Sequence, residues 1–299
     1  METSVHARRG FSLIELIIVI GILAIMVGFL LVALQKGRAS ASLIQNKNNH
    51  RQIILAVHQL ASDHDGNIEN LTRSSMAGVK TARHDSSLFT RLIPYVHGDV
   101  QQPKDLSSAA WVNFLSPEVK VYRNPADPSW DYDPGERTVA GKCSYALNMF
   151  AVDGSLRLAS SIQDGTSQTF ALADKYAVKG SQDYSVAQTV NLYTGIFDPM
   201  NGEVYGWRRA TFADRGWEDV LPVTDGPTAT TKPSIPGMTF QIQPRPELVD
   251  PRIPQTPHQA GLTVALFDGS VTSVKPSVDE GLFWSRVTPS GGEAVRIVD

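Results

Sequence analysis

The apolar run from Phe11 to Leu34 constrains the fold more than any other part of the sequence. It follows Arg8-Arg9-Gly10 and contains one charged residue, Glu15. As a helix, its 24 residues would be about 36 Å long at about 1.5 Å per residue, against a bilayer hydrocarbon core of about 30 Å. The run is therefore long enough to cross a membrane with some tilt, and the carboxylate near its start is a candidate functional group.

Two general explanations of this run are a secretory signal peptide and a plain membrane anchor. Ala39-Ser40-Ala41 could serve as a signal cleavage site. The run is longer than the usual apolar region of about 7–15 residues, however, and Lys36 and Arg38 lie between it and that site. In a plain anchor, Glu15 would sit near the membrane surface with its head among the lipid headgroups. Basic residues flank both ends, so charge counting barely decides the orientation.

A third explanation depends on the residues around the start of the run. Arg9, Gly10 and Phe11, with an acid at Glu15 and about 19 apolar residues after it, resemble the leader of type IV prepilins and type II secretion pseudopilins. The resemblance implies that prepilin peptidase cuts after Gly10 and that Phe11 is N-methylated. Glu15 then becomes the fifth residue of the mature chain. We favour this explanation because the pattern is specific.

The resemblance also gives Glu15 an assembly role. In such filaments the amine of Phe11 in one subunit lies near the glutamate of a neighbour, and a buried charge left without its partner costs several kcal/mol. The implied partners are the membrane, prepilin peptidase and other pilin-like subunits in a homo- or hetero-filament. The implied location is the inner (cytoplasmic) membrane, crossed once, with the C-terminal domain on the periplasmic or extracytoplasmic side and the subunit then entering a filament.

Length and composition limit the remaining possibilities. The 299 residues can bury a sizeable core after the span, in one large soluble domain or two. The net charge is −3, which argues against general nucleic-acid binding. Cys143 is the single cysteine, so an intrachain disulfide is excluded, and we expect this residue to be a small core residue.

The chain divides into four predicted regions. Residues 1–10 are the leader, 11–34 the transmembrane helix and filament core, and 35–62 its amphipathic continuation. Residues 63–299 form an extracytoplasmic α+β domain with a proline-rich excursion at 222–257.

The amphipathic continuation is predicted from apolar positions at helical spacing. Ile53, Val57, Leu60 and Ala61 form the stripe, with Leu43, Ile44 and Ile54 near it. Asp63–Asn67 reads as the stop of the helix.

Strand and turn signals fill much of the rest of the chain. Cys143–Phe150 and Thr169–Ala173 read as strands, and Ser87–His97 as a short helix that ends near Pro94. Leu262–Val274 reads as a hairpin with a type I′ turn at Asp268-Gly269. We therefore predict an α+β, pilin-like fold in which a long N-terminal helix, membrane-spanning in its first half, packs on an antiparallel sheet.

A second resemblance lies in the soluble part. His258 precedes Asp268-Gly269 by nine intervening residues, which resembles the H-X9-DG motif of planctomycete-type prepilin-like proteins. Ser144–Asn148 (SYALN) and Ile162–Thr169 (IQDGTSQT, with Asp164 and Gly165) resemble two further segments of that family. The resemblance implies architecture and location but little chemistry. We expect His258, Asp268, Gly269, Asp164 and Gly165 to have structural roles, with His258 and Asp268 at opposite ends of one strand.

No metal or cofactor is expected, and calcium is the metal whose ligands the sequence could best supply. Its oxygen ligands could come from Asp164, Asp174 or the cluster Asp127, Asp131 and Asp133, but the spacing is not that of an EF-hand loop.

No catalytic residue is predicted. His50, His58 and His64 lack the i, i+4 spacing of a helical zinc site, and no G-x-S-x-G, P-loop or G-x-G-x-x-G occurs. The leading hypothesis is a non-enzymatic pilin-like subunit. The alternative is a membrane-tethered extracytoplasmic binding protein that does not polymerise, with a carbohydrate site built from the prolines and tryptophans of residues 200–257.

Overall fold

The computed structural model describes thirteen stretches of the chain. They are residues 13–66, 88–97, 119–130, 143–148, 151, 157–158, 160–180, 185–187, 194–197, 204–208, 211–212, 239–249 and 253–289. The predicted leader residues Arg9, Gly10 and Phe11 lie outside these stretches, as do Asp131, Asp133 and most of the proline-rich segment. The chain divides into two compact units, Met1–Ser42 and Leu43–Asp299.

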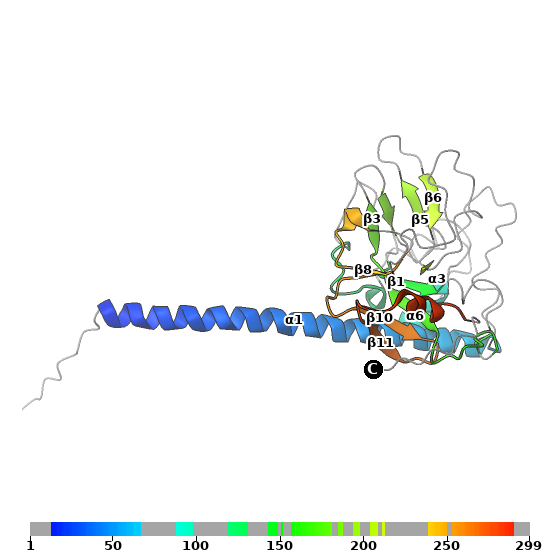
Figure 1. Cartoon of the computed structure of the whole chain (residues 1–299), viewed down its shortest axis with the longest axis horizontal. Helices are drawn as coiled ribbons and strands as arrows, with labels where there is room; N and C mark the ends of the chain where they lie inside the picture. Colours follow the sequence, from blue (N-terminus) through cyan, green and yellow to red (C-terminus); the bar gives the residue numbers. More distant parts are fainter. Residues whose placement is uncertain are drawn as a thin grey trace, which may run out of the picture. The chain divides into compact units, whose positions relative to one another are not determined.

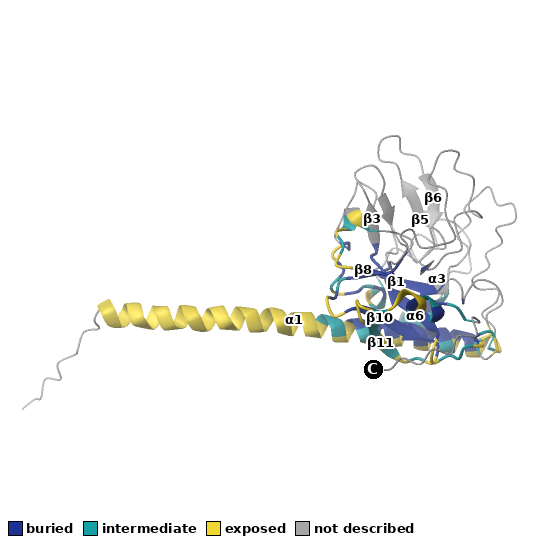
Figure 2. Cartoon of the chain, in the orientation of Figure 1, coloured by how far each residue is buried: buried dark blue, intermediate teal, exposed yellow. Residues whose placement is uncertain are grey.

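The described part of the first unit is helical and exposed on every side. Helix α1 runs from Leu13 to Asp63 as one element of 51 residues. All of its residues from Leu13 to Ala41 are exposed, which Figure 2 shows as a continuous yellow helix. Its most apolar 18-residue window has a mean hydropathy of 3.2, so among the described residues α1 is the one helix long and apolar enough to cross a membrane. That statement is based on the length and composition of the helix alone. The predicted long apolar N-terminal helix is confirmed.

In the second unit, the same helix buries one face. Ile53, Ile54, Ala56, Val57, Leu60 and Ala61 are at most 3% exposed. Ile44 is 61% exposed, so its predicted place near the apolar stripe is wrong. On the N-terminal side of Ile53, the buried face of the helix consists of the polar residues Asn46, Asn49 and His50.

The helix ends where the sequence indicated. The N–H of Gly66 donates to the carbonyl of Ala61 over 2.7 Å, which is the six-to-one bond of a Schellman motif. Asp65, the residue before Gly66, takes the positive φ angle that this motif needs, 54°, and Gly66 follows with a φ of 76°. The predicted stop at Asp63–Asn67 is confirmed for the residues up to Gly66.

The second unit contains a five-stranded sheet, of which β1, β10 and β11 are labelled in Figure 1. Its order is β11-β10-β2-β1-β7. The four strands β11, β10, β2 and β1 are antiparallel, and the short β7 joins β1 in parallel at the edge. Their bounds are Tyr145–Asn148 (β1), Phe170–Asp174 (β2), Thr211–Phe212 (β7), Leu262–Leu266 (β10) and Val271–Val274 (β11). The predicted α+β fold with an antiparallel sheet is confirmed.

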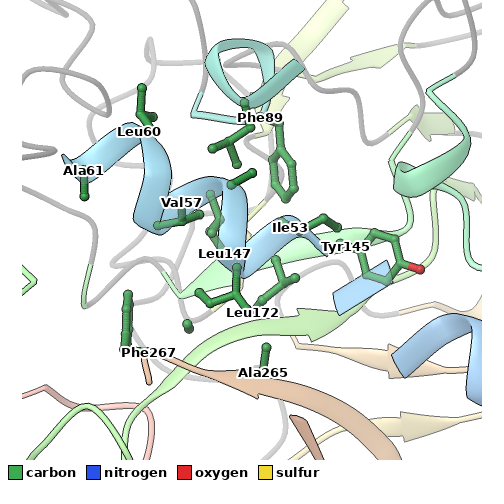
Figure 3. Close-up of a cluster of buried hydrophobic side chains, with 14 of the residues drawn as sticks. Ile53, Val57, Leu60, Ala61, Phe89, Tyr145, Leu147, Leu172, Ala265 and Phe267 are labelled. Carbon is green, nitrogen blue, oxygen red and sulfur yellow. The ribbon is translucent and has the colours of Figure 1, made fainter. Parts of the chain in front are cut away.

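Among the described residues, the two larger core clusters follow the alternation of side chains along the strands. On β10, Leu262, Val264 and Leu266 belong to one cluster, whereas Ala265 belongs to the other. The cluster containing Ala265 also contains the buried face of α1, and Figure 3 shows Ile53 and Val57 beside Leu147, Leu172 and Ala265. The other cluster includes Phe170, Phe240 and Phe283. Helix α1 therefore packs on one set of sheet side chains.

The remaining described elements are short. They are the helices α3 (Leu88–His97) and α6 (Glu280–Ser285), the 3-10 turns η1 (Lys120–Tyr122) and η2 (Pro246–Leu248), the antiparallel strands β3 (Val178–Gly180), β4 (Ser185–Ala187), β5 (Thr194–Phe197) and β6 (Val204–Arg208), and the parallel pair β8 (Gln241–Ile242) and β9 (Gln255–Thr256). Helix α3 contains Pro94 and continues to His97, so the predicted end near Pro94 is wrong. The burial of Phe89, Leu92 and Ile93 supplies packing energy that offsets the backbone hydrogen bond that proline cannot donate.

Candidate functional site

Glu15 is the one charged residue between Leu13 and Gln35, and it lies in the first turn of α1. Its neighbours Leu13, Ile14 and Leu16 are 74, 67 and 52% exposed, so the acid sits on an apolar helix surface. The positive end of the helix dipole favours a carboxylate there. Once lipid or other apolar groups cover that surface, the carboxylate needs a cation in place of water.

A second concentration of polar side chains is buried between α1 and the sheet. At its centre is Asp174, the last residue of β2, which is 0% exposed. His50 Nε2 lies 2.8 Å from Asp174 Oδ1, and Asn46 Nδ2 lies 2.9 and 3.0 Å from the two carboxylate oxygens. The backbone N–H of Thr263 donates to Oδ2 over 3.3 Å. These donors replace the water that the carboxylate loses on burial.

Two asparagines of α1 extend this network to β1. The hydroxyl of Tyr145 donates to Asn46 Oδ1 over 2.9 Å, and Asn49 Nδ2 donates to that hydroxyl oxygen over 3.0 Å. Asn49 Nδ2 also donates to the carbonyl of Arg123 over 2.9 Å. Burial first, and then the charge of Asp174, raise the pKa of Tyr145 well above its ordinary value. The phenol therefore stays neutral and acts as a fixed donor between helix and sheet.

His258 lies in the turn that precedes β10 and is 6% exposed. The backbone N–H of His258 donates to Thr256 Oγ1, and its backbone carbonyl accepts from the N–H of Gly261. Its ring Nε2 has no hydrogen-bond partner among the described residues. Burial lowers the pKa of His258, with Asp174 opposing that shift and His50 adding to it. The side chain is thus held neutral near the polar network.

The structure does not bring His258 together with Asp268 and Gly269. His258 precedes β10, and Asp268-Gly269 follows it in the turn to β11. The two ends of the H-X9-DG pattern therefore lie at opposite ends of one strand.

The turn itself differs from the type I′ prediction. Among the described residues, Asp65 and Gln243 are the non-glycine residues with positive φ, so Asp268 lacks the positive φ that type I′ requires. Gly269, with φ 90°, donates to the carbonyl of Leu266, and the N–H of Leu266 donates to the carbonyl of Ser270. This is the three-residue loop with a left-handed glycine that commonly joins hairpin strands.

Asp164 and Gly165 lie in a turn beside this hairpin loop. Gly165 also has a positive φ, 97°, and the N–H of Asp268 donates to the carbonyl of Thr166 over 3.1 Å. The two Asp-Gly turns therefore support one another through the backbone.

Two of the aspartates named as possible calcium ligands, Asp127 and Asp174, are engaged by internal donors. Asp127 accepts from the N–H and hydroxyl of Ser129, from the Ser144 hydroxyl and from the N–H of Ala177. Burial raises the pKa of Asp127 in spite of these bonds. A calcium ion at Asp127 or Asp174 would have to displace such donors. Within the described stretches, no group of three or more His, Cys, Asp or Glu residues could hold a metal ion.

Cys143 is 0% exposed and belongs to the core cluster with α1, as the sequence predicted. Burial raises the pKa of its thiol, so this cysteine is unreactive.

Sequence reasoning missed the buried network, although a signal was available. Asn46, Asn49 and His50 occupy i, i+3 and i+4 positions, and the apolar stripe begins three residues later at Ile53. Asparagines on the same helix face as a buried apolar stripe indicate that their amides are buried and hydrogen-bonded to other buried polar groups.

Comparison with known proteins identifies the N-terminal part of the chain. Residues 5–31 match the family model described as the prokaryotic N-terminal methylation motif. The match includes Arg9, Gly10, Phe11 and Glu15, and it supports a prepilin-type protein with a prepilin-type N-terminus. No curated protein and no solved structure matches the chain. The H-X9-DG pattern lies beyond the matched residues and stays a resemblance.

Proposed function

We propose that the protein is a pilin-like subunit without catalytic activity, cut after Gly10, N-methylated on Phe11 and assembled into a filament of the type IV pilus or type II secretion class. The observation that carries this proposal is the exposed apolar surface of α1 from Leu13 to Leu34, most of which lies within the matched methylation motif, with Glu15 in its first turn. Such a surface can contact lipid tails before assembly, and afterwards it can pack against the same helix of neighbouring subunits.

Glu15 would set the register of that assembly. Buried among apolar helices, its carboxylate would be strongly destabilised unless the new Phe11 amine of a neighbouring subunit lay beside it. The partners of the chain are then the inner membrane, prepilin peptidase and other pilin-like subunits, and the domain from residue 63 onward is extracytoplasmic.

The buried network supports a structural role for the second unit. The His50–Asp174 pair has the composition of a catalytic dyad, but both side chains are 0% exposed, so a substrate could not reach them. Trp130, which precedes the 200–257 segment, is 7% exposed and lies under the guanidinium of Arg123 at 5.3 Å, so its ring is not open for stacking on a sugar. The side chains of Trp207 and Trp217 lie outside the described residues.

Mass spectrometry of the mature protein tests the processing. In a host with prepilin peptidase, we expect an N-terminus at methylated Phe11. An intact Met1, or a start at Ser42 as for an ordinary signal peptide, would contradict the proposal.

A pair of variants tests assembly. Glu15→Ala should be cut and inserted normally but should form no filaments by electron microscopy, whereas Gln35→Ala, an exposed polar position on the same helix, should assemble like the parent chain. If Glu15→Ala keeps both location and biological function, the tethered, non-polymerising binding protein is the better description.

A further inference from the structure

Lys36 and Arg38 lie immediately after the apolar part of α1, at a position that the length of the helix fixes. Leu16–Gln35 are 20 consecutive uncharged residues between Glu15 and Lys36. Because α1 is one unbroken helix, this interval is about 30 Å long, which equals the thickness of a bilayer hydrocarbon core. When Glu15 is at one membrane surface, Lys36 is therefore at the other.

The two cations point to different sides of the helix. Two residues of helix correspond to about 200° of rotation, so Lys36 and Arg38 do not share a face. Both are exposed, and Gly37 and Ala39–Ser42 beside them are small. A protein partner would contact one face, whereas a lipid leaflet surrounds the helix. This geometry fits a leaflet.

Neither cation can pair with an acid on its own helix within the first unit. Residues three or four positions from Lys36 and Arg38 are Val32, Ala33, Leu34, Gln35, Ala39, Ser40, Ala41 and Ser42. Helical side chains lean toward the N-terminus, which directs both cations back toward the end of the apolar segment. At that level the available anions in a membrane are the phosphodiesters of the lipid headgroups.

We propose that Lys36 and Arg38 form a phosphate-binding collar that holds the extracytoplasmic end of the apolar segment of α1 at the lipid headgroups and fixes the depth of the span before assembly. The ligand is the phosphodiester of a phospholipid, bound by the guanidinium and ammonium groups. The inference rests on the proposed membrane span but not on filament formation.

Depth-dependent fluorescence quenching of the full chain tests the collar. Ser40→Cys gives a label beside the collar, and Cys143 does not compete for the fluorophore because it is 0% exposed. The unsubstituted chain, treated in the same way, checks that selectivity. The labelled protein is placed in vesicles of phosphatidylcholine and phosphatidylglycerol that carry a spin label either on the headgroup or deep in the acyl chain.

We expect strong quenching by the headgroup label in the parent chain. Lys36→Gln with Arg38→Gln should lower the ratio of headgroup to acyl-chain quenching about twofold, because neutral side chains are less costly to bury. The charge-preserving pair Lys36→Arg with Arg38→Lys should match the parent. In vesicles of a phosphate-free galactolipid, the parent and the double glutamine variant should not differ.

An unchanged ratio in the double glutamine variant would overturn the collar while leaving the span intact. A difference that persists in galactolipid vesicles would overturn the phosphate assignment. If neither spin label quenches the parent chain, the helix does not span the vesicle, and the collar falls together with the proposed membrane location.

Discussion

The substitution Asp174→Asn tests whether the buried network fixes α1 to the sheet. It keeps the shape of the side chain but replaces one acceptor oxygen with an NH2 donor. In the native chain both carboxylate oxygens face donors only: Asn46 Nδ2 reaches both, His50 Nε2 reaches Oδ1 and the Thr263 N–H reaches Oδ2. Neither orientation of the new amide can satisfy this set.

The cost follows from the donors that lose their acceptor. With NH2 in the place of Oδ2, the hydrogen bonds that Thr263 N–H and Asn46 Nδ2 donate to this oxygen are lost. With NH2 in the place of Oδ1, His50 must accept at Nε2 and carry its proton on Nδ1, a buried atom without a hydrogen-bond partner among the described residues. A buried unsatisfied donor costs about 1–3 kcal/mol, so two give a destabilisation of about 2–6 kcal/mol.

Urea unfolding of the full chain in detergent micelles, followed by tryptophan fluorescence, measures this loss. We expect the midpoint to fall by about 1–2 M with little change in slope. Asp268→Asn is the matched control, because an asparagine oxygen can still accept the Ser270 N–H as Asp268 Oδ1 does over 2.8 Å. The reasoning is refuted if Asp174→Asn and the control both stay within about 0.5 kcal/mol of the parent.

Three further predictions concern other parts of the second unit. Gly261→Ala should destabilise the domain by about 2–4 kcal/mol in the same urea assay, since φ is +125° and a Cβ would lie 2.1 Å from the Val274 carbonyl oxygen; Gly269→Ala, with φ +90° and open space, should cost less, and equal costs would argue against the steric reason. Leu172→Ala should cost about 2–5 kcal/mol, because this side chain is 0% exposed in the cluster that packs on α1; a loss below about 1 kcal/mol would show that the contact with α1 is loose. The pKa of His258 is lowered by burial, so the unfolded chain binds the proton more readily and stability should fall as pH drops below about 6.5; His258→Gln should flatten that part of the pH–stability curve, and an unchanged curve would exclude His258 as its source.

The long helix and the hairpin could be predicted from the sequence because each depends on local patterns. The first part of α1 is a continuous apolar run, the apolar positions from Ile53 to Ala61 repeat at helical spacing, and the stop at Asp65 and Gly66 is encoded by adjacent residues. The β10–β11 hairpin follows from alternation around Asp268-Gly269, although the loop has three residues and not two.

Features that depend on distant partners could not be predicted in the same way. Asn46 is an ordinary polar residue in its local sequence, and its burial becomes intelligible only when Asp174 and Tyr145 face it. Pro94 signals a helix end locally, yet the burial of Leu92 and Ile93 outweighs one missing backbone bond. Tertiary packing thus overrides local preference at both places.

The buried network also has a consequence for the order in which the chain can fold. Asn46 depends on Asp174, 128 residues later, and on Thr263, 217 residues later. Contacts at such separation form slowly because a long loop must close before they contribute. In the proposed export of the domain, its residues emerge from the membrane in sequence order, so the second half of α1 cannot dock until β10 has emerged. Truncation before Thr263 should leave this helix half undocked and open to proteases, so that the native domain forms only from a nearly complete chain.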